Sequence, residues 1–219
     1  MWEYLLISAV SGLIAFKLAL ILYRRRKYPE PHYEWGNIDL DEISFPDNFL
    51  WGAATAAHQI DGNLSNNWTA HEEKNNLEKS GEACNHWNLW KDDFQMLTDL
   101  GLTSYRFSIE WSRLEPEEGS WNNDALDVYS QMIDDLISRG IRPTVTLHHF
   151  SHPVWWEEKG GFADKNNLND FLNYSERVFD ALSDRVDVWC TINEPTVFST
   201  MGYTLGQFPP GKRSIRLTL

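Results

Sequence analysis

From residue 45 onward, short hydrophobic runs alternate with longer segments whose apolar residues recur at helical spacing. Four of the short runs predict strands: "FLWGAAT" (49 to 55), "SYRFSIEW" (104 to 111), "RPTVTLHHF" (142 to 150) and "VDVWCTINE" (186 to 194). Runs of this length that are rich in aromatic and β-branched residues are typical of buried strands. The pattern therefore predicts four strands in this part of the chain.

The segments between these strands predict helices. They are "NHWNLWKDDFQMLTDLG" (85 to 101), "NDALDVYSQMIDDLISRG" (123 to 140) and residues 167 to 183. In the second segment the apolar residues share one helical face, and Gly140 follows as a C-cap. An alternation of strand and helix implies parallel strands that are joined by crossover helices.

The residues at the end of each strand decide between an open sheet and a barrel. No glycine-rich phosphate loop follows the first strand, so a nucleotide-binding sheet loses its main support. Polar residues stand on or soon after each strand instead: Gln59; Arg106 and Glu110; His148 and His149; Asn193 and Glu194. Polar groups that converge at the carboxyl ends of parallel strands are typical of a TIM barrel active site. We predict a (β/α)8 TIM barrel of which about the first four β/α units are present.

The N-terminal segment has a different pattern. The run "LLISAVSGLIAFKLALIL" (5 to 22) is long enough to span a bilayer as a helix. Basic residues follow it at 24 to 27 and no small-residue cleavage site appears, so an uncleaved anchor fits better than a signal peptide. We predict a transmembrane anchor over residues 1 to 27, a proline-containing linker over 28 to 44 and the half barrel over 45 to 219.

The orientation of this single-pass anchor can be predicted from the basic run. The positive-inside rule places the body on the cytoplasmic side of the membrane. Three Asn-x-Ser/Thr sequons, at Asn63, Asn67 and Asn173, would matter only in a luminal protein. We favour the cytoplasmic side.

Charge and composition narrow the class of partner. The formal net charge is −13, and the five cations and one acid before Tyr28 leave 14 positive and 31 negative charges, a net of −17, on the body. Such a body repels phosphates, which excludes nucleic acid. Eleven Trp fit either sugar stacking or a bulky core. Cys84 and Cys190 are too few for a disulfide scaffold, and we expect buried thiols.

Five motifs resemble glycoside hydrolase family 1, the β-glucosidase family, over about residues 45 to 211. They are "FLWGAATAAHQIDG", "YRFSIEWSRLEPEEG", "PTVTLHHFSHPVWW", "WCTINEP" and "GYTLGQFPPG". The resemblance implies a carbohydrate or glycoside substrate. It also implies that Glu194 is the general acid/base, that Arg106 lies beside the nucleophile, and that Gln59, His149 and Asn193 hydrogen-bond the sugar.

The chemistry of retaining hydrolysis agrees with this assignment. It needs two carboxyl groups about 5 to 5.5 Å apart, one that attacks the sugar and one that protonates the leaving oxygen and then activates water. The acid must hold its proton, which favours a partly desolvated place beside another negative charge. A strand end inside a barrel mouth provides such a place for Glu194.

Several residues depart from the family pattern or have a structural alternative. His148 replaces a common aromatic residue, and "FSHP" replaces the usual Trp-Asp-Leu-Pro. A metal site made of His148, His149 and His152 lacks an acidic ligand, so we predict no metal and no other cofactor. Glu110 is a candidate structural carboxylate, and Trp155, Trp156 and Trp189 are expected in the core.

The family's nucleophile lies in a Thr/Ser-Glu-Asn-Gly motif that does not occur in this sequence. This leaves two hypotheses: the N-terminal half of a membrane-anchored β-glycosidase, inactive alone, or a non-catalytic form that binds sugar or another half barrel. A transglycosylase that acts on membrane glycolipid is a third. We favour the enzyme. A half barrel also leaves its fourth strand unpaired, so we expect aggregation or dimerisation.

Overall fold

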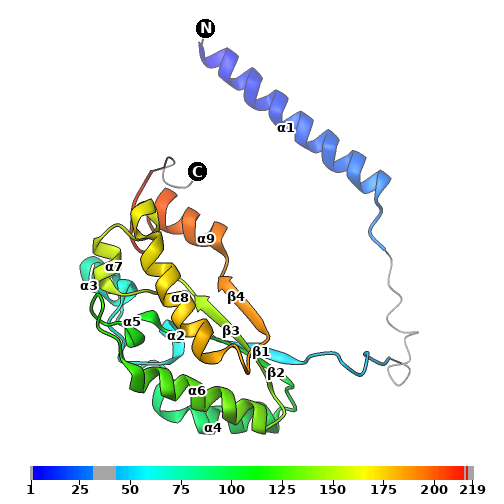
Figure 1. The fold of residues 1–219 in the computed structure, drawn as a ribbon. Helices are drawn as coiled ribbons and strands as arrows, with labels where there is room; N and C mark the ends of the chain where they lie inside the picture. Colours follow the sequence, from blue (N-terminus) through cyan, green and yellow to red (C-terminus); the bar gives the residue numbers. More distant parts are fainter. Residues whose placement is uncertain (1, 32–42, 215, 217–219) are drawn as a thin grey trace. The chain divides into compact units, whose positions relative to one another are not determined.

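The computed structural model describes residues 2–31, 43–214 and 216, with side chains described from Val10 onward. The chain divides into two compact units, Met1–Asp47 and Asn48–Leu219. The first contains helix α1 (Trp2–Lys27), and the second contains the sheet and the remaining helices (Figure 1). Residues 32 to 42 of the predicted linker lie outside the described residues.

Helix α1 covers the run predicted as a membrane anchor, residues 5 to 22, but the described residues do not support a transmembrane assignment. Within the described part of the chain, no helix combines the length and the apolar character that a bilayer crossing requires. The described side chains of α1 include Lys17 and the basic run at 24 to 27, which lowers their mean hydropathy. The side chains of residues 5 to 9 lie outside those described.

Four parallel strands form a single sheet in the order in which they occur along the chain. They are β1 (Gly52–Ala54), β2 (Ser104–Ser108), β3 (Arg142–His148) and β4 (Val188–Ile192) (Figure 1). Each strand is shorter than predicted, but the parallel order is confirmed. Consecutive parallel neighbours joined by crossover helices are the arrangement of a TIM barrel, here present in part.

The three crossover helices are α4 (His86–Asp99), α6 (Asn123–Ser138) and α8 (Leu168–Leu182), close to the predicted bounds. Shorter helices follow the strands: α2 (Ala57–Ile60), α3 (Asn67–Asn75), α5 (Trp111–Leu114), α7 (Val154–Glu158), η3 (Gly161–Ala163), η4 (Lys165–Asn167), α9 (Pro195–Ser199) and the π-helix η5 (Thr200–Thr204). These short helices belong to the loops at the carboxyl ends of the strands, where a barrel places its active site.

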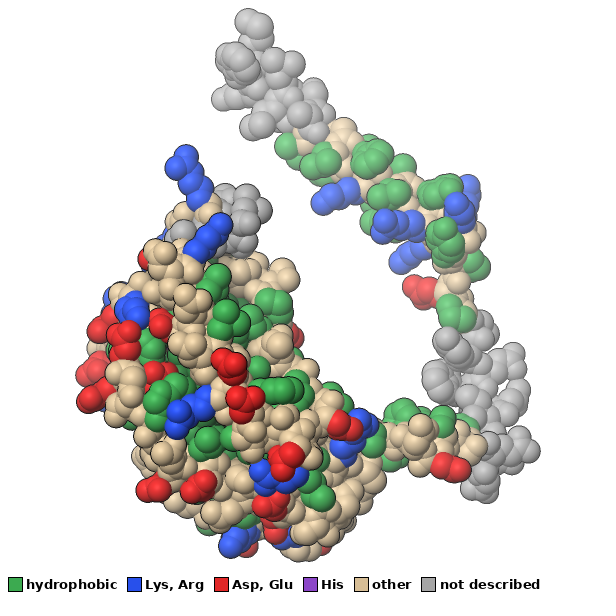
Figure 2. All heavy atoms as spheres, viewed as in Figure 1, with side chains coloured by type: hydrophobic (Ala, Val, Ile, Leu, Met, Phe, Trp, Pro, Cys, Tyr) green, Lys and Arg blue, Asp and Glu red, His purple; other side chains and the backbone are tan. Residues whose placement is uncertain are grey.

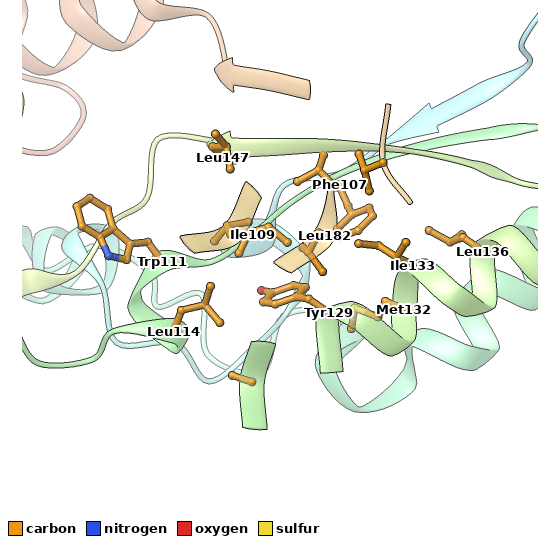
Figure 3. Packing of buried hydrophobic residues seen from close by; sticks show 14 of the residues in the cluster. Phe107, Ile109, Trp111, Leu114, Tyr129, Met132, Ile133, Leu136, Leu147 and Leu182 are labelled. Carbon is orange, nitrogen blue, oxygen red and sulfur yellow. The ribbon is translucent and has the colours of Figure 1, made fainter. Parts of the chain in front are cut away.

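The strand register separates an apolar face from a polar one. Phe107 pairs with Val145, and both are buried in the cluster that Leu136 of α6 also joins (Figure 3). The opposite face carries polar side chains, since Arg106 pairs with Thr144. Side chains alternate between the two faces of a strand, so the polar face is the one that a closed barrel turns inward.

Aromatic side chains fill the core beside α7 and α8. Trp111 stacks on Tyr174 with ring centroids 4.7 Å apart and contacts Trp156, which is fully buried. The Tyr174 hydroxyl donates to the Leu147 carbonyl at 2.8 Å. Trp155 and Trp189 are partly buried against the same cluster, so the expectation that these three Trp belong to the core is confirmed.

The cysteines differ from expectation. Cys84 is exposed and Cys190 is half-buried, and both are free thiols. Cys84 lies in the turn before α4, and Cys190 lies on β4, an edge strand of the sheet. Neither position has packed neighbours on every side, which is why neither thiol is fully buried.

Helix α6 allows a matched test of the core. We expect Leu136→Ala to lower the free energy of unfolding by about 2–5 kcal/mol, because it removes buried methyl groups and leaves a cavity. The neighbouring Ile137 is 44% exposed, so Ile137→Ala should cost less than about 1 kcal/mol. Urea unfolding of the full chain measures both, and equal losses would contradict this packing.

Candidate active site

A hydrogen bond links the carboxyl ends of β2 and β4. Arg106 Nη2 of β2 donates to Oδ1 of Asn193, which directly follows β4, at 2.7 Å. The Asn193 backbone N–H donates to the His148 carbonyl at 2.9 Å, which extends the pairing of β4 with β3. Two of the predicted site residues therefore meet across the intervening strand β3, although they stand 87 residues apart in the sequence.

His149 follows β3 and lies close enough to Arg106 for the guanidinium to affect its titration. Burial lowers the pKa of the His149 imidazole to about 4, and the positive charge of Arg106 contributes to this lowering. The ring is therefore neutral at pH 7. Its Nδ1 and the Nε of Arg106 are both buried and have no hydrogen-bond partner among the described residues. Unsatisfied buried polar atoms are candidates for contact with a ligand.

Glu194 occupies a sharp corner between β4 and α9. Its backbone has φ 41° and ψ 58°, in the left-handed region that residues other than Gly seldom adopt. Pro195 behind it stands at the start of α9, where its fixed φ suits the first helical turn. Strained backbone of this kind is concentrated at functional sites. Strand β4 ends at Ile192, and two residues later the chain turns at Glu194 into α9.

Two predicted site residues make no side-chain hydrogen bond to the other predicted site residues in the part of the chain that the structure describes. Glu194 and Gln59 are both exposed, and Gln59 lies in α2, beyond β1. The structure thus brings together Arg106, His149 and Asn193, while Glu194 and Gln59 face solvent. The partly desolvated place that the chemistry requires of Glu194 is not formed by the described residues, and its role stays a prediction.

The loop after β3 is held by residues that sequence analysis did not identify as functional. Phe150 has φ 70°, and its carbonyl accepts hydrogen bonds from Asn67 Nδ2 at 3.1 Å and Trp68 Nε1 at 3.0 Å. Asn67 Oδ1 also accepts from the His152 backbone N–H at 2.9 Å. In the sequence, Asn67 stands out only as part of a sequon. Its amide is buried and engaged in fixing this loop.

Glu110 supports the same loop from the end of β2. Its carboxylate is fully buried and accepts hydrogen bonds from the hydroxyls of Ser112 and Ser151, each at 2.7 Å. These contacts support a structural role for the Glu110 carboxylate, as the sequence analysis suggested. Ser151, which stands at a position where the family pattern has Asp, thus ties the loop after β3 to the carboxylate that follows β2.

His148 and His152 form a hydrogen-bonded chain rather than a metal site. His152 Nε2 lies 2.8 Å from Glu157 Oε2, so its N–H donates to the carboxylate. His152 Nδ1 lies 3.1 Å from His148 Nε2, so the two rings share a hydrogen bond. Burial lowers the pKa of His148 well below its usual value, which keeps this ring neutral. Across the described residues, no group of three His, Cys, Asp or Glu side chains is arranged to hold a metal ion.

A partial parallel barrel with polar groups at the carboxyl ends of its strands defines a protein of the TIM-barrel class. The profile of glycosyl hydrolase family 1 matches residues 41–218. The chain therefore belongs to that family, as its motifs indicate.

Known proteins agree with this membership. The chain is 40% identical over 182 residues to β-glucosidase A of Thermotoga maritima, a match that covers 78% of this chain and 41% of that protein. It is 47% identical to a solved β-glycosidase of Pyrococcus horikoshii, with a TM-score of 0.76 over 80% of this chain and 41% of that one. The Thermotoga maritima enzyme solved with a methoxycarbonyl-substituted glucoimidazole gives 38% identity and a TM-score of 0.76, over 80% of this chain and 42% of that one. The chain thus spans about two fifths of the length of these relatives.

The lowered pKa of His149 predicts how the stability of the folded chain depends on pH. Since the folded pKa of His149 is about 4 and its ordinary value is 6.5, the unfolded chain binds more protons between these pH values. Stability should therefore rise as the pH rises from about 4 to 6.5, and His149→Gln should flatten this slope. NMR titration of the imidazole measures the pKa directly. A His149 pKa near 6.5 would contradict the burial of this ring beside Arg106.

Proposed function

We propose that the protein to which this chain belongs is a retaining β-glycosidase, a β-glucosidase-like hydrolase with a glycoside substrate. The observation that carries this proposal is the joining of Arg106, Asn193 and His149 at the carboxyl edge of the sheet, with Arg106 Nε and His149 Nδ1 left without hydrogen-bond partners among the described residues. Sugar hydroxyls both donate and accept hydrogen bonds. They are the kind of group that such atoms would contact.

Each predicted site residue has its own role in the proposed hydrolysis of the glycoside. Glu194 protonates the departing glycosidic oxygen and, in the second step, removes a proton from the attacking water. Asn193, held by Arg106, contacts the sugar beside the reacting carbon, and neutral His149 and Gln59 contact other hydroxyls. Arg106 keeps the opposing carboxylate nucleophile ionised. The relative solved with a glucoimidazole binds a sugar analogue, which supports a glycoside substrate.

The 219 residues alone should not turn over glycosides. The Thr/Ser-Glu-Asn-Gly motif that would supply the nucleophile is absent from this sequence, and Glu194 is exposed. Retaining catalysis needs a second carboxylate about 5 to 5.5 Å from the acid/base, and that nucleophile is the residue that the absent motif would supply.

The role of Glu194 can be tested in a chimera in which residues 45 to 211 replace the matching part of the Thermotoga maritima β-glucosidase A. In this enzyme Glu194→Ala removes the proton donor and leaves the nucleophile. Alkyl glycosides, whose leaving groups need a proton, should lose about 10²–10⁴-fold in kcat/KM, and dinitrophenyl glycosides should lose little in the first step. Azide needs no general base, so it should restore turnover and give a β-glycosyl azide.

Two other carboxylates serve as controls. Glu158 is exposed on α7, so Glu158→Ala should leave both classes of substrate unaffected. Glu110 is buried and supports the loop after β3, so Glu110→Ala should lower stability without a dependence on the leaving group. If Glu194→Ala lowers kcat/KM equally for substrates with good and poor leaving groups, and azide has no effect, Glu194 is not the acid/base.

A further inference from the structure

Two buried histidines lie near the corner that carries Glu194. His148 is the last residue of β3 and is 1% exposed, and His152 in the following loop has no exposed surface. Both stand where the family pattern has an aromatic or an apolar side chain. A buried polar ring destabilises a core unless its nitrogens find hydrogen-bond partners. The two rings therefore depend on the partners that the surrounding residues offer.

A series of hydrogen bonds holds both rings. His148 Nε2 lies 3.1 Å from His152 Nδ1, and His152 Nε2 lies 2.8 Å from Glu157 Oε2. The Glu157 side chain is 19% exposed, and Figure 2 shows acidic side chains at the surface near α7, the helix that contains it. The series thus runs inward from a carboxylate near the surface to a fully buried ring. We name His148, His152 and Glu157 the histidine support.

The hydrogen bond to His152 gives the His148 ring a single orientation. Edge-to-face contacts surround this ring, with Phe162 at 5.1 Å and Phe171 at 6.1 Å between ring centroids. An imidazole keeps almost the same outline when it makes half a rotation about its bond to Cβ, so such contacts accept either orientation. Only one of the two presents Nε2 to His152. The hydrogen bond therefore adds a directional constraint that apolar contacts lack.

The oriented His148 ring packs against the helix that follows Glu194. Its centroid lies 5.2 Å from that of Phe198 of α9, with an angle of 78° between the ring planes. Phe198 is 4% exposed, and its backbone N–H donates to the Glu194 carbonyl at 3.0 Å. The His148 carbonyl accepts from the Asn193 N–H at 2.9 Å. His148 thus supports the corner on both sides, through its backbone before Glu194 and through its ring after it.

The corner at Glu194 needs such support. Its φ of 41° lies in the left-handed region, which costs free energy for a residue with a side chain. Its own side chain is exposed and makes no capping hydrogen bond to α9. Backbone of this kind persists only when the surrounding structure fixes it. The contacts of Phe198 and His148 supply that constraint from the buried side.

We propose that His148, His152 and Glu157 are positioning residues that hold Glu194 in place for proton transfer. This inference rests on the proposed function, in which Glu194 is the acid/base. The hydrogen bonds orient the His148 ring, the ring seats Phe198, and the Phe198 N–H fixes the Glu194 carbonyl. A general acid must lie within hydrogen-bond reach of the leaving oxygen, so a small displacement of the corner lowers the rate of this step.

The central hydrogen bond can be measured in the full 219-residue protein without any activity. Nitrogen NMR should show an imidazole N–H between His148 and His152 that exchanges slowly with water, because both rings are buried. This signal should be lost in His152→Leu. An unmodified protein in which every imidazole N–H exchanges freely would contradict the proposal.

The chimera used for Glu194 tests the role in catalysis. His152→Leu introduces the residue that the family pattern has at this position and removes the bond to His148. We expect kcat/KM for alkyl glycosides to fall about tenfold or more, and that for dinitrophenyl glycosides less than about threefold, since only alkyl leaving groups need the proton of a well-placed acid. A defect of packing alone would lower both values alike.

Two further variants separate orientation from packing. His148→Phe combined with His152→Leu leaves no buried nitrogen without a partner, and the outline of Phe is unchanged by half a rotation. Activity toward alkyl glycosides should therefore return to within about threefold of the parent chimera. Glu157→Ala should reproduce part of the selective loss, whereas Glu158→Ala, at the exposed neighbouring carboxylate of α7, should have no effect. Because Glu157 is partly exposed, this pair decides the question if His152→Leu does not fold.

Equal losses for both substrate classes in His152→Leu, equal effects of Glu157→Ala and Glu158→Ala, or no recovery in the double variant would overturn the proposal. Glu194→Ala separates this result from the proposed function. If Glu194→Ala depends on the leaving group and His152→Leu does not, the histidine support has no positioning role and the acid/base assignment stands. If Glu194→Ala shows no such dependence, the acid/base assignment fails, and the positioning role fails with it.

Discussion

Parallel pairing of four consecutive strands is the constraint on which the rest of this structure depends. The backbone ladders from β1 to β4 bring the carboxyl ends of all four strands to one edge of the sheet. Only there can Arg106 reach Asn193, which lies 87 residues further along the chain, with a hydrogen bond of 2.7 Å. The helices cover one face of the sheet, so its other face is free to carry polar groups.

Buried hydrogen bonds then give the loops at this edge a fixed shape. Glu110 binds Ser151, Asn67 binds both the carbonyl of Phe150 and the N–H of His152, and Glu157 binds His152. Buried polar groups with partners make a loop rigid and unique in conformation. The His149 side chain, in contrast, leaves its Nδ1 without a partner among the described residues. A rigid support beneath unsatisfied polar atoms is the arrangement that substrate binding requires.

The order of strands and helices could be predicted from the sequence because the spacing of apolar residues follows the face of each element that is buried. Those faces are buried within the residues that the structure describes. The meeting of Arg106, His149 and Asn193 could also be predicted, because parallel strands share one carboxyl edge. The clamp by Asn67 and Trp68 could not, since its partner Phe150 stands 82 or more residues away and no local pattern marks the pair.

Other expectations failed because they depend on surroundings that sequence patterns do not describe. Cys84 was expected in the core and is exposed, because it lies in a turn rather than on a packed face. Glu194 was expected in a partly desolvated place, and it is exposed among the described residues. Its neighbours on β3 and β4 fix its position along the strand, but its desolvation depends on the other wall of the barrel.

The separation between Glu194 and the carboxylate opposite it tests this arrangement most directly. It can be measured in a crystal structure of the chimera that joins residues 45 to 211 to the remaining part of the Thermotoga maritima β-glucosidase A. If the edge formed by Arg106, His149 and Asn193 is the glycoside site of a retaining enzyme, the two carboxyl groups should lie about 5–5.5 Å apart. A separation beyond about 6.5 Å, or a Glu194 side chain directed away from the barrel mouth, would contradict it.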